Sequence, residues 1–210
     1  MYMAIADADI SQTSMKDSRF NNAGWFSILG AVLFYPAIIL ALLAMSHTNL
    51  RPLLFIEIPL AIFACVLNVY VFFQLKRLVN ERYFLHNINI LITLQIVCYI
   101  VLCVKDIFIT LMILIYSDTD FVSLLDSILG TAGFLMIGIV GILFGVGLLR
   151  IHDDSAGLLR TYAIISIIAA CCFISVILFP IGIFLGVSNS VILGAVFFKA
   201  AESDALVEFV

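Results

Sequence analysis

Charged residues are scarce in this sequence. Asp, Glu, Lys and Arg make up 11% of its 210 residues, whereas a soluble domain usually has about 25%. Hydrophobic residues make up 64%, and the mean hydropathy is +1.24. A water-soluble domain of this size must keep a large polar surface, which this composition does not supply. The shortage of charge therefore excludes an ordinary soluble domain and indicates a chain immersed in a lipid bilayer.

Several chemical motifs are also missing. No run of Lys and Arg exceeds two residues, which argues against nucleic acid as a partner. The five cysteines lie in apolar stretches without a CxxC pair, so neither a disulfide framework nor a metal site is expected. HExxH, GxSxG and Walker A motifs are absent as well. We therefore expect a protein that is not an enzyme, with no catalytic, cofactor-binding or metal-binding residues.

Long apolar stretches are abundant, and they predict an all-α fold: a polytopic transmembrane helical bundle. About 20 apolar residues suffice to cross a bilayer. The predicted spans cover residues 25–45, 53–75, 88–116, 128–149, 162–179 and 182–198. These six spans would form three antiparallel hairpins, joined by short polar segments and by an acidic loop at 118–126. The domain is expected to comprise residues 24–199, between an N-terminal tail (1–23) and a C-terminal tail (200–210).

The last apolar stretch decides the number of spans. As one helix, residues 162–198 would be about 55 Å long, which exceeds the thickness of a bilayer. The segment Phe179–Gly182 contains Pro180 and is the predicted break, because proline cannot continue a helix and glycine tolerates a turn. The alternative is five spans, with one long kinked helix at the end.

The positions of the basic residues predict the orientation. Arg51 falls outside, and Lys105 lies within a span. With six spans and a cytoplasmic N-terminus, the remaining eight of the ten basic residues face the cytoplasm: Lys16, Arg19, Lys76, Arg77, Arg82, Arg150, Arg160 and Lys199. This strong bias follows the positive-inside rule.

Ionisable and amide side chains within the predicted spans are the candidate functional residues, because unpaired polar groups are costly in hydrocarbon. They are Glu57, Lys105, Asp106, Asn68, Gln95 and Asn189. Lys105 and Asp106 either anchor the helix at the outer headgroups or lie deeper and serve an ion or proton pathway. Glu57 is the hypothesised partner of Lys105.

Small residues recur on two of the predicted spans and predict helix-packing faces. Helices in lipid associate through close packing, which small residues permit. The fourth span carries Gly138, Gly141 and Gly145, and the sixth carries Gly182, Gly186, Ser190 and Gly194. Packing within the bundle is the favoured interpretation. An oligomer interface or a narrow pore is the alternative.

The C-terminal hairpin resembles that of small bacterial multi-pass inner-membrane proteins of unknown function. The resemblance is carried by Leu178–Gly182, Ile192–Gly194 and Phe197–Phe198 and covers about the last 50 residues. It implies a bacterial inner membrane as the location and implies no activity.

The expected function is a non-enzymatic scaffold or a subunit of a membrane complex, with lipid and other membrane proteins or a second copy as partners. The alternative is a small solute or ion transporter or channel that works as an oligomer. A transporter should bring polar residues from several spans into one cavity within the membrane. A scaffold should have scattered, satisfied polar residues.

Overall fold

The computed structural model describes residues 19–33, 36, 39–40, 54–83, 86–115, 119–151 and 157–207. These residues form six α-helices and no β-strand, which confirms the predicted all-α bundle. An N-terminal helix occupies residues 19–33, and the rest of the predicted first span lies largely outside the described residues. The other helices are α2 (Leu54–Tyr83), α3 (His86–Ile115), α4 (Thr119–Leu149), α5 (Leu158–Ile174) and α6 (Phe179–Val207).

Helix α2 is longer than predicted, whereas α3 agrees closely with the predicted span at 88–116. The predicted second span ends at residue 75, but α2 continues through the polar segment Lys76–Arg82 to Tyr83. Its 30 residues correspond to about 45 Å, which exceeds the roughly 30 Å of a hydrocarbon core. The polar end of α2 therefore reaches the headgroup region or the water beyond it.

The prediction of an acidic loop at 118–126 is wrong for most of these residues. Helix α4 begins at Thr119, so Asp120 and Asp126 are helical. Asp120 lies in the first turn, where the helix dipole favours a negative charge. The helical backbone also fixes the direction of the Asp126 side chain, which proves important for Lys105.

The predicted break near Pro180 is real but begins earlier in the chain. Helix α5 ends at Ile174, Ser175 is extended, and a 3-10 turn covers Val176–Leu178. Pro180 then lies in the first turn of α6, where its missing N–H removes no helical hydrogen bond. Helix α6 continues to Val207, so much of the predicted C-terminal tail at 200–210 is helical.

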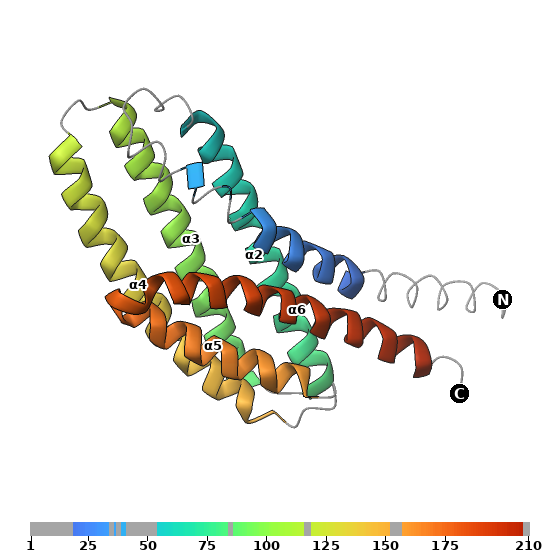
Figure 1. The fold of residues 1–210 in the computed structure, drawn as a ribbon. Coiled ribbons are helices and arrows are strands. Elements are labelled where there is room, and N and C mark those ends of the chain that lie inside the picture. Colours follow the sequence, from blue (N-terminus) through green and yellow to red (C-terminus); the bar gives the residue numbers. More distant parts are fainter. Residues whose placement is uncertain are drawn as a thin grey trace.

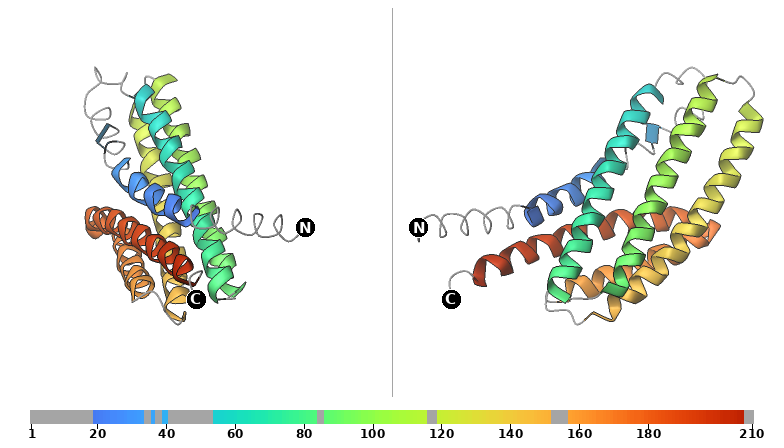
Figure 2. Two further views of the ribbon diagram at one scale, coloured as in Figure 1. Left: turned by 90° about the vertical axis from the view of Figure 1, so that its right-hand side faces the viewer. Right: turned by 180° about the vertical axis from the view of Figure 1, so that it is seen from behind.

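The helices form two groups. Helices α2, α3 and α4 lie side by side, and α5 and α6 lie across one half of their length (Figure 1). The two further views show the same arrangement, with the N-terminal helix running beside α6 (Figure 2). Helices that follow one another in the sequence are in contact, from α2 with α3 to α5 with α6.

The N-terminal helix joins the two ends of this series. Its Phe26 ring lies 5.3 Å from the Tyr70 ring of α2, measured between centroids. On another face, the Ser27 hydroxyl donates a hydrogen bond of 2.6 Å to the Ser190 carbonyl oxygen of α6. The six helices therefore form a closed ring in which each helix contacts the next.

The outside of this ring is apolar. Exposed side chains include Phe55, Ile90, Ile115 and Phe184, each at least 65% exposed. The apolar windows of the four longest helices are only 17–39% buried. Polar side chains are buried instead, among them Glu57, Gln74, Gln95, Thr110 and Ser166. Such a distribution is unfavourable in water and favourable in lipid.

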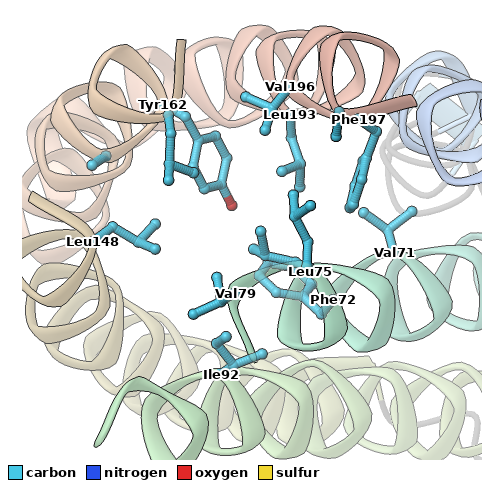
Figure 3. Packing of buried hydrophobic residues seen from close by; sticks show 14 of the residues in the cluster. Val71, Phe72, Leu75, Val79, Ile92, Leu148, Tyr162, Leu193, Val196 and Phe197 are labelled. Atoms are coloured by element: carbon cyan, nitrogen blue, oxygen red, sulfur yellow. The ribbon is translucent and has the colours of Figure 1, made fainter. Parts of the chain in front are cut away.

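A single large apolar cluster fills the end of the ring where α5 and α6 cross α2. It contains Leu75, Val79, Ile92, Leu148 and Phe197, all at most 1% exposed (Figure 3). These side chains come from α2, α3, α4 and α6, so the cluster holds the two groups of helices together.

Four described helices, α2, α3, α4 and α6, are long and apolar enough to cross a membrane. Helix α5 has 17 residues and is apolar but shorter, about 26 Å. Together with the apolar exterior, these helices identify a membrane-embedded protein that contacts lipid.

The glycines of α4 lie against α5. A Cβ atom added at Gly138 would lie 2.9 Å from the Ala170 carbonyl oxygen, and one at Gly145 would lie 2.9 Å from that of Ala163. At Gly141 the added atom would lie 3.0 Å from the Ala170 Cβ. Only glycine allows the two backbones to approach this closely.

The small residues of α6 face two neighbours. Gly182 and Gly186 lie against Phe173 of α5, and Gly194 lies against the Gly24 carbonyl oxygen of the N-terminal helix. The Ser190 hydroxyl donates to the carbonyl oxygen of Gly186, one turn earlier in the same helix. The glycines on which packing was expected thus serve contacts within this chain.

We predict that Gly138→Ala and Gly145→Ala each destabilise the protein by about 1–3 kcal/mol, because the added methyl group overpacks the contact between α4 and α5. Gly130→Ala is the matched control on the same helix, since its Cβ would meet no atom closer than 3.9 Å. Alanine should stabilise that position by up to about 1 kcal/mol. Denaturation with sodium dodecyl sulfate, followed by circular dichroism, measures these differences. Equal stability of the three variants would contradict the close contact.

Candidate functional site

A cavity of about 70 Å³ lies inside the ring of helices. One water molecule needs roughly 10–15 Å³ of such space, so the cavity can hold several waters or one small solute. Every one of the six helices contributes to its lining. The polar lining residues are Ser27, Asn68, Gln95, Tyr99, Tyr162, Ser166, Asn189 and Ser190.

Helical periodicity places these residues on inward faces. Gln95 and Tyr99 are four residues apart on α3, and Tyr162 and Ser166 are four apart on α5. Residues at this spacing lie one above the other on the same face of a helix. The Gln95 side chain hydrogen-bonds the Tyr99 hydroxyl, and Ser166 hydrogen-bonds the Tyr162 hydroxyl. Figure 3 shows the Tyr162 ring pointing inward from α5, with its hydroxyl among apolar side chains.

Hydrogen bonds across the ring connect the polar residues of different helices. The Asn189 amide nitrogen of α6 donates to the Ser166 hydroxyl of α5 over 2.7 Å. The Asn68 amide nitrogen donates to the Ala64 carbonyl oxygen of its own helix over 2.9 Å. Together with the bond between Ser27 and Ser190, these contacts engage one donor each of Ser27, Asn68 and Asn189.

Two acceptors of the lining have no partner. The Oε1 atom of Gln95 and the Oδ1 atom of Asn189 are both buried without a hydrogen bond. Gln95 is only 5% exposed. An unsatisfied buried carbonyl group typically destabilises a protein by about 1–3 kcal/mol. These two oxygens are therefore positioned to accept hydrogen bonds from a molecule inside the cavity.

Two apolar clusters flank the cavity and contribute residues to its lining. On one side lies the large cluster around Leu75 and Ile92. On the other side lies a smaller cluster of Cys98, Ile137 and Val140, with Leu102 and Phe173 packed against it. The cavity is thus a polar compartment between a thick and a thin apolar layer.

A charged cluster lies beyond the thin layer. The Lys105 ammonium group of α3 lies 2.8 Å from an Asp126 carboxylate oxygen of α4 and 2.7 Å from one of Asp106. Lys105 precedes the end of α3 by ten residues, about 15 Å. The Lys105 side chain is 16% exposed and that of Asp106 is 51% exposed, so the cluster opens to one side.

Glu57 does not form the predicted ion pair with Lys105, although it is buried nearby. Its carboxylate accepts a hydrogen bond of 3.3 Å from the Thr110 hydroxyl of α3. The principal partner of Lys105 on another helix is Asp126. That partner was missed because residues 118–126 were expected to form a loop, whose side-chain directions cannot be inferred.

The structure therefore divides the candidate residues into two groups. Asn68, Gln95 and Asn189 meet at the cavity, whereas Glu57, Lys105 and Asp106 belong to the charged end. Sequence reasoning missed the tyrosines of the cavity, Tyr99 and Tyr162. Their spacing of four residues from Gln95 and Ser166 was the available signal. Among the described residues, no group of three or more His, Cys, Asp and Glu side chains could hold a metal ion.

The contact between Lys105 and Asp126 yields a testable prediction. In a double-mutant cycle with Lys105→Met and Asp126→Asn, we expect a coupling energy of about 1 kcal/mol, which is within the range for contacting residues. A parallel cycle with Lys105→Met and Glu57→Gln serves as the matched control and should show a smaller coupling. Stability in detergent is the measurement. Stronger coupling to Glu57 than to Asp126 would contradict this arrangement.

No protein-family model, curated protein or solved structure matches this chain.

Proposed function

We propose that this membrane protein is a small solute transporter or channel whose interior cavity is the solute-binding compartment. The observation that carries the proposal is the convergence of polar residues from five of the six helices on one cavity. A protein that only packs against other helices has no need for such a compartment, because its polar groups would be satisfied by one another. The proposal is non-enzymatic and assigns no cofactor.

The apolar layers support this function. A transporter must hold its solute away from both aqueous sides at some stage, and an apolar constriction blocks water and solutes by dewetting. The layer of Cys98, Ile137 and Val140 is thin, and the charged cluster of Lys105 and Asp126 lies beyond it. We propose that solute enters and leaves the cavity through this thin layer.

A scaffold or subunit of a membrane complex was the first expectation from the sequence. The glycines of α4 and α6 lie against helices of the same chain, as a scaffold would also require. The convergence of polar groups favours transport over this reading, and the experiment below separates the two.

The proposed location is the cell inner membrane, with six crossings and the N-terminus in the cytoplasm. Alternating helix directions place Arg82 of α2 and Arg150 after α4 at one end of the bundle, together with the start of α5 at Arg160. Arg82 also donates to the Ala200 carbonyl oxygen, which places the neighbouring Lys199 at that end. Asp126 and Asp106 lie toward the opposite end, and this asymmetry supports the positive-inside orientation.

Labelling of engineered cysteines tests the orientation. In intact cells, a membrane-impermeant thiol reagent should modify Asp120→Cys, at the exposed start of α4, and should leave Arg150→Cys, at its exposed end, unmodified. Both variants would be made in a chain whose five native cysteines are replaced by alanine or serine. After the cells are opened, Arg150→Cys should react. The reverse pattern would invert the proposed topology.

Flux through proteoliposomes tests the function. The purified full-length chain should carry urea, glycerol or potassium ions faster than empty liposomes do. Gly186→Leu should reduce that flux at least tenfold. An added Cβ there meets Phe173 at an ordinary 3.7 Å, and because Gly186 lines the cavity, the remaining side-chain atoms would occupy it.

Ala132→Leu is the matched control, because it adds a leucine side chain at an exposed position of α4 that does not line the cavity. Its flux should stay within about twofold of the wild type. If none of the three solutes is carried, the transport proposal is overturned, and the scaffold function is the one that remains. Equal flux through the two variants would show that the cavity is not the pathway.

A further inference from the structure

The two unpartnered amide oxygens suggest which solutes the cavity accepts. We infer that Gln95 Oε1 and Asn189 Oδ1 form an acceptor pair that recognises small, uncharged solutes carrying N–H donors, of which urea and primary amides are the simplest. This inference rests on the proposed transport function and adds its substrate class. The pair comes from α3 and α6, so a solute bound by both oxygens would bridge the two groups of helices.

The lining favours a solute that brings donors, because its unpartnered atoms are acceptors while several of its donors are bonded within the protein. The Asn189 nitrogen is bonded to Ser166, the Asn68 nitrogen to Ala64, and the Ser27 hydroxyl to Ser190. What remains unsatisfied are the two carbonyl oxygens. A solute that brings only acceptors would leave these oxygens unpaired, and such mismatches carry the full cost of desolvation.

The lining also excludes charge. Among the residues that the structure describes, no Asp, Glu, Lys, Arg or His lines the cavity. Lys105 and Asp126 lie beyond the apolar layer of Ile137 and Val140. An ion in the cavity would lose its hydration without meeting a counter-charge, which is strongly unfavourable. Uncharged solutes avoid this cost.

The volume of the cavity limits the size of the solute. A cavity of about 70 Å³ is far below the roughly 300–1,000 Å³ of sites for drug-sized ligands. It fits a solute of a few non-hydrogen atoms.

The chain supplies its own control for the acceptor pair. Gln74 of α2 is 4% exposed, and its Oε1 atom is also buried without a partner. Gln74 is not a lining residue of the cavity. Gln95→Met and Gln74→Met therefore remove equally buried, equally unsatisfied amides, one inside the cavity and one outside it.

The experiment compares the fluxes of urea, water and potassium ions in proteoliposomes of the full-length chain. Wild-type protein should carry urea and exclude potassium ions. Gln95→Met and Asn189→Leu should each lower urea flux about five- to tenfold, which corresponds to the loss of one hydrogen bond. Gln74→Met should change urea flux by less than twofold, and water flux should change little in any variant.

Stability separates recognition from a structural role. Gln95→Met removes the unpaired acceptor together with the hydrogen bond to the Tyr99 hydroxyl, so we expect this variant to fold in detergent with a moderate loss of stability, as a loss of one hydrogen bond predicts. If this variant does not fold, Gln95→Asn provides the second test, because it retracts the amide by one methylene and should lower urea flux similarly.

The outcomes distinguish the inference from the function on which it rests. Glycerol or potassium flux without urea flux, or urea flux that is equal in Gln95→Met and the wild type, overturns the inference and leaves transport intact. Flux of water alone shows that the acceptors hold only water, which also overturns the inference. The absence of all flux overturns both proposals.

Discussion

Hydrocarbon offers no partner to a polar group, and this constraint shapes the whole protein. In a bilayer, each hydrogen bond of the chain must be made within the protein or with molecules that it encloses. The buried side chains of Gln95, Ser166, Glu57 and Thr110 follow from this requirement, as does the apolar exterior around them. The fold is therefore inverted relative to a soluble domain, with its polarity gathered in the centre.

Close helix packing makes this centre possible. Gly138 and Gly145 allow α4 to approach the backbone carbonyl groups of α5, while Gly194 allows α6 to approach the N-terminal helix. These contacts close the ring and leave a small space where Gly141 and Gly186 carry no side chain. Glycines of α4 and α6 thus both pack the helices and line the cavity.

The charged groups and the uncharged cavity lie at different levels of the bundle. Lys105 is compensated by carboxylates on its own helix and on α4, so it does not require a ligand. The uncharged cavity lies deeper, behind an apolar layer, and its two amide oxygens are not compensated. A pathway for small uncharged solutes would need a cavity lined by neutral hydrogen-bonding groups. Such a cavity binds neutral molecules and offers no counter-charge to an ion.

The sequence alone determined that the protein lies in lipid, that its fold is all-α, and roughly where its helices lie. These properties depend on composition and on the length of apolar stretches, which are local. Helix ends were predicted less well, because polar segments such as Lys76–Arg82 and Asp120–Asp126 continue a helix once its apolar part is established.

Only the tertiary structure decided which polar residues meet. Helices that are apolar on every side carry no amphipathic pattern to reveal their inward face. The rotation and crossing of the helices could therefore not be derived from the sequence. The pairing of Lys105 with Asp126 rather than Glu57, and the meeting of Gln95 with Asn189 in one cavity, both depend on these rotations. The rotations depend on contacts between helices, among them the glycine contacts of α4 with α5 and of α6 with the N-terminal helix.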